Sequence, residues 1–134
     1  MKIEIAELAG YCFGVKRALA IAEETLVQKK GKNIYTVGQI IHNPQVVKEL
    51  DDQGIHSVES ADQIPEKSIV IIRSHGLPPS TTNMLEKKNI STVDATCPFV
   101  KTAHKKIREL ESEGYFVVLV GTSNHPEVIG IAEQ

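Results

Sequence analysis

Short runs of β-forming residues alternate along the chain with stretches in which apolar residues recur at helical spacing. The β-rich runs cover residues 3–8, 33–37, 68–72, 91–93 and 115–120. This alternation is typical of βαβ units, in which parallel strands are joined by crossover helices. The sequence therefore predicts an α/β fold with a largely parallel sheet. A further edge strand is expected near residues 55–58.

Two of the helical stretches have a clear apolar face. In the first, over about residues 13–29, that face holds Val15, Ala18, Leu19, Ala22 and Leu26. In the fourth stretch, it holds Val100, Ala103, Ile107 and Leu110. Gly31 and Gly114 follow these helices and are typical stop signals. We expect both helices to pack on the sheet.

The organisation into lobes must be inferred from topology, because no Ser- or Pro-rich linker divides the chain. A boundary around residues 96–98 is most consistent with the pattern, so that residues 1–97 form a first α/β lobe and residues 98–134 begin a second. After Pro126 a helix starts and stops after roughly two turns without a cap. We therefore expect the chain to be the N-terminal portion of a longer protein.

The composition of the chain argues against several classes of protein. The chain has 134 residues, 41% of them hydrophobic and 24% charged, with a net charge of −2, which predicts a soluble globular protein rather than a nucleic-acid-binding polycation. The basic run Lys29, Lys30 and Lys32 is expected to be a solvated helix end. The sequence has no secretory signal and no apolar run of roughly 20 residues, so we expect a cytoplasmic protein outside the membrane, or a plastid protein after removal of a transit peptide.

Cysteine and histidine occupy matching positions along the chain. Each of the five predicted strand-to-helix junctions contains one of them: Cys12, His42, His75, Cys97 and His125. In open α/β sheets these junctions lie at the carboxyl ends of the strands, where helix N-termini attract phosphate groups and other anions. Two distant cysteines in a reducing compartment are expected to be thiols or metal ligands rather than a disulfide.

The residue types leave several chemistries open. Cys12 and Cys97 suit iron-sulfur or zinc ligation, but two thiolates complete neither site. The three junction histidines suit phosphate oxygens or zinc. Any one of these residues alone would be read as a buried thiol or a capping imidazole.

Of four further ionisable residues, one is a candidate site residue and three are expected to be structural or exposed. Glu127 falls in the first helical turn after His125, where it is either a favourable dipole partner or a proton donor. His56 and His104 stand apart from the junction pattern and are expected to be structural or exposed. Asp94 is expected to cap the turn before Cys97.

The ordered motifs resemble those of the 4-hydroxy-3-methylbut-2-enyl diphosphate reductase family. They run through the chain as residues 9–18 (AGYCFGVKRA), 42–44 (HNP), 73–76 (RSHG), 93–98 (VDATCP) and 125–130 (HPEVIG). The resemblance implies three similar α/β lobes around a central 4Fe-4S cluster held by three cysteines. Cys12 and Cys97 match two of those ligands, and the third cysteine is absent from this chain.

The resemblance also implies the site and the reaction. Residues matching His42, His75 and His125 bind the diphosphate of the substrate, and the residue matching Glu127 supplies protons as the C–O bond is reductively broken. The products are isopentenyl and dimethylallyl diphosphate of the methylerythritol phosphate pathway, with electrons from an external donor such as ferredoxin or flavodoxin. Two other interpretations remain: a non-catalytic diphosphate-binding module without a cluster, and a zinc hydrolase.

Overall fold

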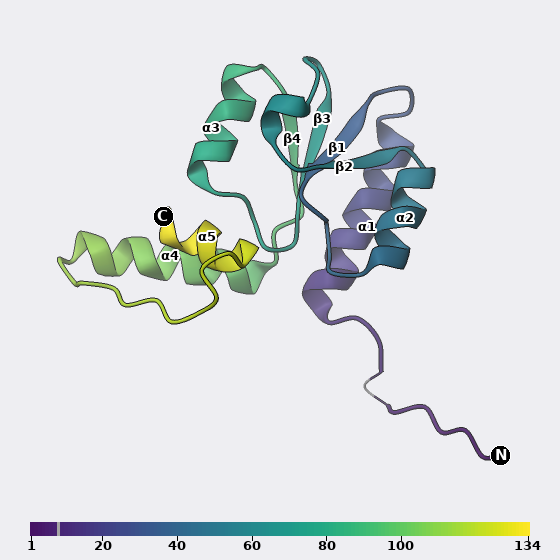
Figure 1. Cartoon of the computed structure of the whole chain (residues 1–134), viewed down its shortest axis with the longest axis horizontal. Helices are drawn as coiled ribbons and strands as arrows, with labels where there is room; N and C mark the ends of the chain where they lie inside the picture. Colours follow the sequence, from purple (N-terminus) through teal and green to yellow (C-terminus); the bar gives the residue numbers. More distant parts are fainter. Residues whose placement is uncertain (8) are drawn as a thin grey trace.

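A four-stranded parallel sheet forms the centre of the molecule in the computed structural model, which describes residues 1–7 and 9–134 (Figure 1). The strands are β1 (Ile34–Val37), β2 (Ile55–Val58), β3 (Ile69–Ile72) and β4 (Ser91–Asp94). Their order across the sheet is β2-β1-β3-β4, and every pairing is parallel. The predicted α/β fold is therefore confirmed, and so is the edge strand at residues 55–58.

Helices cover both faces of the sheet, giving three layers. The helices are α1 (Phe13–Gln28), α2 (Pro44–Asp52), the short 3₁₀ helix η1 (Ala61–Gln63), α3 (Pro79–Lys87), α4 (Pro98–Ser112) and α5 (Pro126–Ala132). Helices α1 and α2 lie on one face, and α3 lies on the other (Figure 1). Helix α1 matches its predicted range to within one residue.

The central strand β3 explains why both faces need cover. Ile69 and Ile71 pack with α1 and α2, whereas Val70 and Ile72 pack with η1 and α3. Because all four side chains are buried, the strand reads as a continuous apolar run rather than as an alternating pattern. The parallel arrangement places the carboxyl ends of β1, β3 and β4 at one edge, which is the edge that carries the candidate site.

Two segments predicted as strands are not strands in the structure. In the first, over residues 3–8, the chain up to residue 7 is exposed and irregular, and residue 8 lies outside the described residues. In the second, over residues 115–120, Phe116 and Val120 are each 91% exposed. A strand requires a neighbouring strand for its backbone hydrogen bonds. Neither segment pairs with a strand in the described chain, so their β-rich composition alone does not produce a sheet.

Helix α4 extends away from the carboxyl end of the sheet, with α5 beside it (Figure 1). The apolar residues expected to pack on the sheet are only partly buried, namely Val100, Ala103, Ile107 and Leu110. Such partial cover is expected when a helix contacts mainly one short helix. Within the described residues, no helix has the length and apolarity needed to cross a membrane.

Candidate functional site

The five junction residues all lie near the start of a helix or in a loop that follows a strand. Cys12, Cys97 and His125 are the N-cap residues of α1, α4 and α5, and His42 immediately precedes the N-cap residue of α2. His75 lies in the loop after β3. The strand-to-helix pattern is confirmed at His42, His75 and Cys97. At Cys12 and His125 only the helix N-terminus is present, because residues 1–7 and 115–120 form no strand.

Three imidazole rings converge at this edge of the sheet. The ring centroids of His42 and His75 are 4.8 Å apart, and the ring of His125 lies 5.6 Å from each of them. The loops that carry these rings are 33 and 50 residues apart in sequence. The structure therefore brings together the three histidines that the sequence pattern singled out.

A hydrogen bond sets the orientation of the His125 ring. Its Nδ1 accepts the backbone N–H of Glu127 at 3.2 Å, which caps α5. A neutral imidazole that accepts at Nδ1 carries its proton on Nε2. His125 therefore has an N–H donor available for a ligand.

The environment of His75 favours its neutral form. Burial lowers the pKa of His75 below its usual 6.5, and the nearby His42 and Arg73 lower it further, while Glu127 acts in the opposite direction. Its Nδ1 is buried and has no hydrogen-bond partner within the described residues. A neutral ring in this position gains a proton most readily when an anion binds beside it.

The two cysteines belong to neighbouring loops. A Cβ added at Gly14 would lie 2.6 Å from the Sγ of Cys97, so the glycine leaves room for this sulfur beside the first turn of α1. The guanidinium of Arg17 on α1 donates to the carbonyl oxygen of Thr96 at 3.0 Å, which ties the two loops together. Cys12 and Cys97 are both free thiols.

Ser74 joins the histidine loops to the cysteine loop. Its N–H and its hydroxyl both donate to the carbonyl oxygen of Ile40, at 3.3 and 3.1 Å, and its own carbonyl oxygen accepts the N–H of Cys97 at 2.9 Å. Nearby, the side-chain amide of Asn43 donates to the hydroxyl of Tyr11 at 3.2 Å. These bonds hold the loops in place, and sequence reasoning did not find them, because they join positions far apart in the chain.

Two adjacent hollows lie between these loops. The first, of about 180 Å³, is lined by Cys12, Gly14, Val15, Ser74, His75, Cys97, Val100 and Glu127. The second, of about 190 Å³, is lined by Tyr11, Val15, Ile41, His42, Asn43, Ser74 and His75. His75 lines both hollows, so the thiols and Glu127 lie beside the histidine cluster. Each hollow is smaller than the ~300–1,000 Å³ of typical small-molecule sites.

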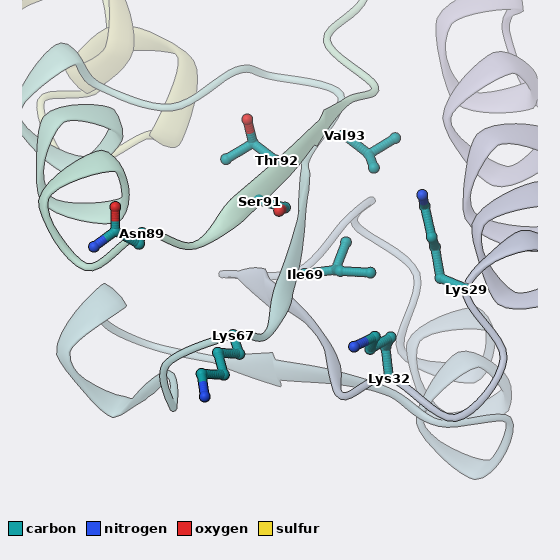
Figure 2. Close-up of a pocket in the computed structure, with 8 residues that line it drawn as sticks. All are labelled: Lys29, Lys32, Lys67, Ile69, Asn89, Ser91, Thr92 and Val93. Carbon is teal, nitrogen blue, oxygen red and sulfur yellow. The ribbon is translucent and has the colours of Figure 1, made fainter.

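A larger hollow lies elsewhere and has different chemistry. It has a volume of about 480 Å³ and is lined by Lys29, Lys32, Lys67, Ile69, Asn89, Ser91, Thr92 and Val93 (Figure 2). Its residues come from the end of α1 and from the starts of β3 and β4, at the opposite end of the strands from the cysteines. The lining holds neither thiol nor imidazole. The predicted solvent exposure of Lys29, Lys30 and Lys32 is confirmed.

The structural roles expected of the other ionisable residues are largely confirmed. Asp94 accepts the N–H of Thr96 at 2.8 Å and pairs with Lys101 at 2.5 Å. Burial alone would raise the pKa of Asp94, but the hydrogen bonds from Lys101 and Thr96 outweigh it and lower the pKa. His56 is exposed and contacts Asp51. His104 is buried, as expected of a structural residue, although it borders the site more closely than its sequence position indicates.

The described residues weigh against a zinc site. Across residues 1–7 and 9–134, no three Cys, His, Asp or Glu side chains are grouped so that they could hold one metal ion. A zinc hydrolase needs at least three protein ligands. The zinc interpretation therefore has no support in the arrangement of these side chains.

Comparison with known proteins decides the family. The family model described as LytB protein matches residues 3–134. The chain belongs to the LytB family. A curated LytB relative from Aquifex aeolicus, named 4-hydroxy-3-methylbut-2-enyl diphosphate reductase, is 54% identical over 96% of this chain and 44% of its own length. One of the same name from Clostridioides difficile is 44% identical over 98% of this chain and 47% of its own length.

Solved structures extend the family match to the fold. A structure of (E)-4-hydroxy-3-methyl-but-2-enyl diphosphate reductase superposes with a TM-score of 0.84 at 50% identity, covering 98% of this chain and 46% of that one. The Plasmodium falciparum reductase superposes with a TM-score of 0.89 at 35% identity, covering 95% of this chain and 40% of that one. This LytB chain thus spans less than half the length of these relatives, and it has the fold of the matching part of both solved structures.

Proposed function

We propose that this LytB-family chain belongs to a 4-hydroxy-3-methylbut-2-enyl diphosphate reductase of isoprenoid synthesis. The enzyme would remove the substrate hydroxyl reductively to give isopentenyl and dimethylallyl diphosphate. The main support is the position of His75, which lines both the hollow with the two thiols and the hollow beside the histidine cluster. A redox group and a diphosphate would then lie next to each other.

The donor set fits an iron-sulfur cluster incompletely. Cys12 and Cys97 would be two cysteine ligands of a 4Fe-4S cluster. Gly14 leaves space beside the Cys97 sulfur, which the Cβ of any other residue would fill. A third cysteine would have to come from residues outside this chain, which has two. When bound, such a cluster supplies electrons and an iron with Lewis-acid character.

The histidine cluster would bind the diphosphate. His125 offers its Nε2–H, and His42 and His75 can each present an N–H or, once protonated, a positive charge. The N-terminus of α2 lies directly after His42 and adds the positive end of a helix dipole. An anion bound here would oppose the burial that lowers the pKa of His75 and would draw a proton onto that ring.

Glu127 would deliver a proton to the reacting end of the substrate. The reaction adds two electrons and two protons, breaks the C–O bond, and releases the hydroxyl as water. Glu127 lines the same hollow as Cys12 and Cys97, so its carboxyl group would lie near the space that the hydroxyl would occupy. A carboxyl group at hydrogen-bonding distance is suited to general acid catalysis.

Other elements of the proposal concern the whole protein. Residues 1–97 would form the first of three similar lobes, and residues 98–134 would begin the second. The small hollows would be completed by further residues, and electrons would come from an external carrier such as ferredoxin or flavodoxin. We propose a cytoplasmic or plastid location.

Anaerobic reconstitution of the full-length protein with iron and sulfide tests this function. We expect a brown protein that converts the diphosphate substrate to the two products with a chemical electron donor. The isolated chain 1–134 should show no turnover, and turnover by it would contradict the need for further residues. The exposed His56 provides a control, since His56→Gln should retain full activity.

A diphosphate-binding module without a cluster is the second candidate. It is favoured by one observation, that the histidine cluster forms within this chain alone. This candidate predicts a colourless protein after reconstitution that still binds inorganic diphosphate. A brown, active protein would exclude it.

A further inference from the structure

His104 is a buried ionisable residue that the proposed mechanism leaves without a role. It lies on α4 with 8% of its surface exposed. Its Nε2 is buried and has no hydrogen-bond partner within the described residues. Because an unpaired buried polar atom is destabilising, such an atom in a folded protein calls for a partner, either a side chain or a water.

Two glycines lie beside the His104 ring, and the nearer of them, Gly76, leaves it space that a side chain would crowd. A Cβ at Gly76 would lie 3.2 Å from the Cε1 of His104, and a Cβ at Gly130 would lie 3.7 Å from both Cε1 and Nε2. Gly76 directly follows His75, and the carbonyl oxygen of His75 is itself 3.8 Å from the same Gly130 position. The imidazole therefore lies between the loop of a site histidine and helix α5.

The face of α5 that meets His104 also carries Glu127. Residues three apart share a helix face, and Glu127 lies three residues before Gly130. The charge of Glu127 acts on the His104 ring, although burial and Arg108 together lower the pKa of His104 below its usual 6.5. The ring is therefore neutral at neutral pH and has one N–H to donate.

We propose that His104 is a positioning residue for Glu127. Its Nε2–H donates to one water, which in turn donates to the Glu127 carboxylate and holds it toward the hollow lined by Cys12 and Cys97. The ring also fixes the spacing between α5 and the His75 loop. This role rests on the proposed reductase function, because it assigns a task to Glu127 within that reaction.

Two substitutions in the full-length reconstituted protein separate positioning from packing. His104→Phe keeps a ring of similar size but removes the N–H, whereas His104→Gln keeps an N–H donor at a similar reach. We expect His104→Phe to lower kcat at least about tenfold with KM within about twofold, and His104→Gln to recover most of the loss. Iron content should be unchanged in both, and His56→Phe is the control on an exposed histidine.

Two kinetic results would overturn the proposal. The first is wild-type kcat in His104→Phe, which would show that the ring only fills space. The second is an equal loss in His104→Phe and His104→Gln when both proteins fold and hold iron.

A spectroscopic measurement on the chain 1–134 makes the test independent of the His104 variants and of activity. The ring-nitrogen resonances of His104 should shift when Glu127 is changed to Gln, while those of His56 stay in place. Unchanged His104 resonances would overturn the proposal. If the full-length wild type fails to reduce the substrate, the reductase function is wrong, but this spectrum still decides whether His104 interacts with Glu127.

Discussion

Replacing Gly14 by Ala tests how closely the Cys97 sulfur lies against the start of α1. The added Cβ would lie 2.6 Å from Sγ and 3.1 Å from the Cβ of Cys97. The first distance is roughly 1 Å inside the ~3.5 Å at which ordinary van der Waals contact begins. Cys97 or the first turn of α1 must therefore move.

The expected magnitude follows from two opposing effects. Overpacking costs about 1–3 kcal/mol of the free energy of unfolding, and the better helix propensity of Ala returns about 1 kcal/mol at most. We therefore expect Gly14→Ala to destabilise the chain by about 1 kcal/mol. The effect on the cluster should be larger, because displacing one ligand or its support weakens metal binding by about 10–100-fold.

The assay compares iron and sulfide per chain after anaerobic reconstitution of the full-length protein with limiting iron. Gly14→Ala should bind much less of both than the wild type, while thermal unfolding of the cluster-free protein shows only the small loss. The matched control is Gly14→Ala in a Cys97→Ala background, where removal of Sγ should reduce the destabilisation. Full iron content in Gly14→Ala would refute the packing of this sulfur beside α1.

Three further predictions address the histidines and the acid. Glu127→Gln should keep the cluster and the affinity for inorganic diphosphate but lower turnover sharply; unchanged turnover would remove its role as proton donor. His42→Phe should weaken diphosphate binding about tenfold in calorimetry, since a hydrogen bond to a charged group contributes about 1.5–3 kcal/mol; equal affinity would exclude His42 from the site. The folded-state pKa values of His75 and His104 lie below 6.5, so protonation favours the unfolded chain. The free energy of unfolding should therefore be greatest above pH 6.5 and fall as the pH drops below that value. A melting temperature equal at pH 7.5 and 5.5 would contradict this.

The sequence predicts elements well where the pattern alone decides them. The run Ile69–Ile72 is apolar throughout because β3 is covered on both faces, and Ala18 and Ala22 on the apolar face of α1 are completely buried. The segments 3–8 and 115–120 have equally good β composition. Residues 3–7 and 115–120 form no strand, because pairing depends on a neighbour, which local composition does not encode.

The same distinction applies to the site. The convergence of His42 and His75 could be predicted, because parallel strands place their carboxyl ends at one edge of the sheet. The approach of His125 could not be predicted in this way, because no strand precedes it in the structure. The contact between Gly14 and the Cys97 sulfur could not be predicted, since it joins positions 83 residues apart. Contacts of this kind depend on how the loops pack once the sheet has formed.

Anomalous diffraction at the iron absorption edge, from crystals of the reconstituted full-length protein, would locate the metal and so decide whether the two cysteines hold the cluster. We predict iron bonded to the sulfur atoms of Cys12 and Cys97, in the hollow that Glu127 also lines. Iron bonded instead to His42, His75 or His125, or iron remote from both cysteines, would contradict the proposed site.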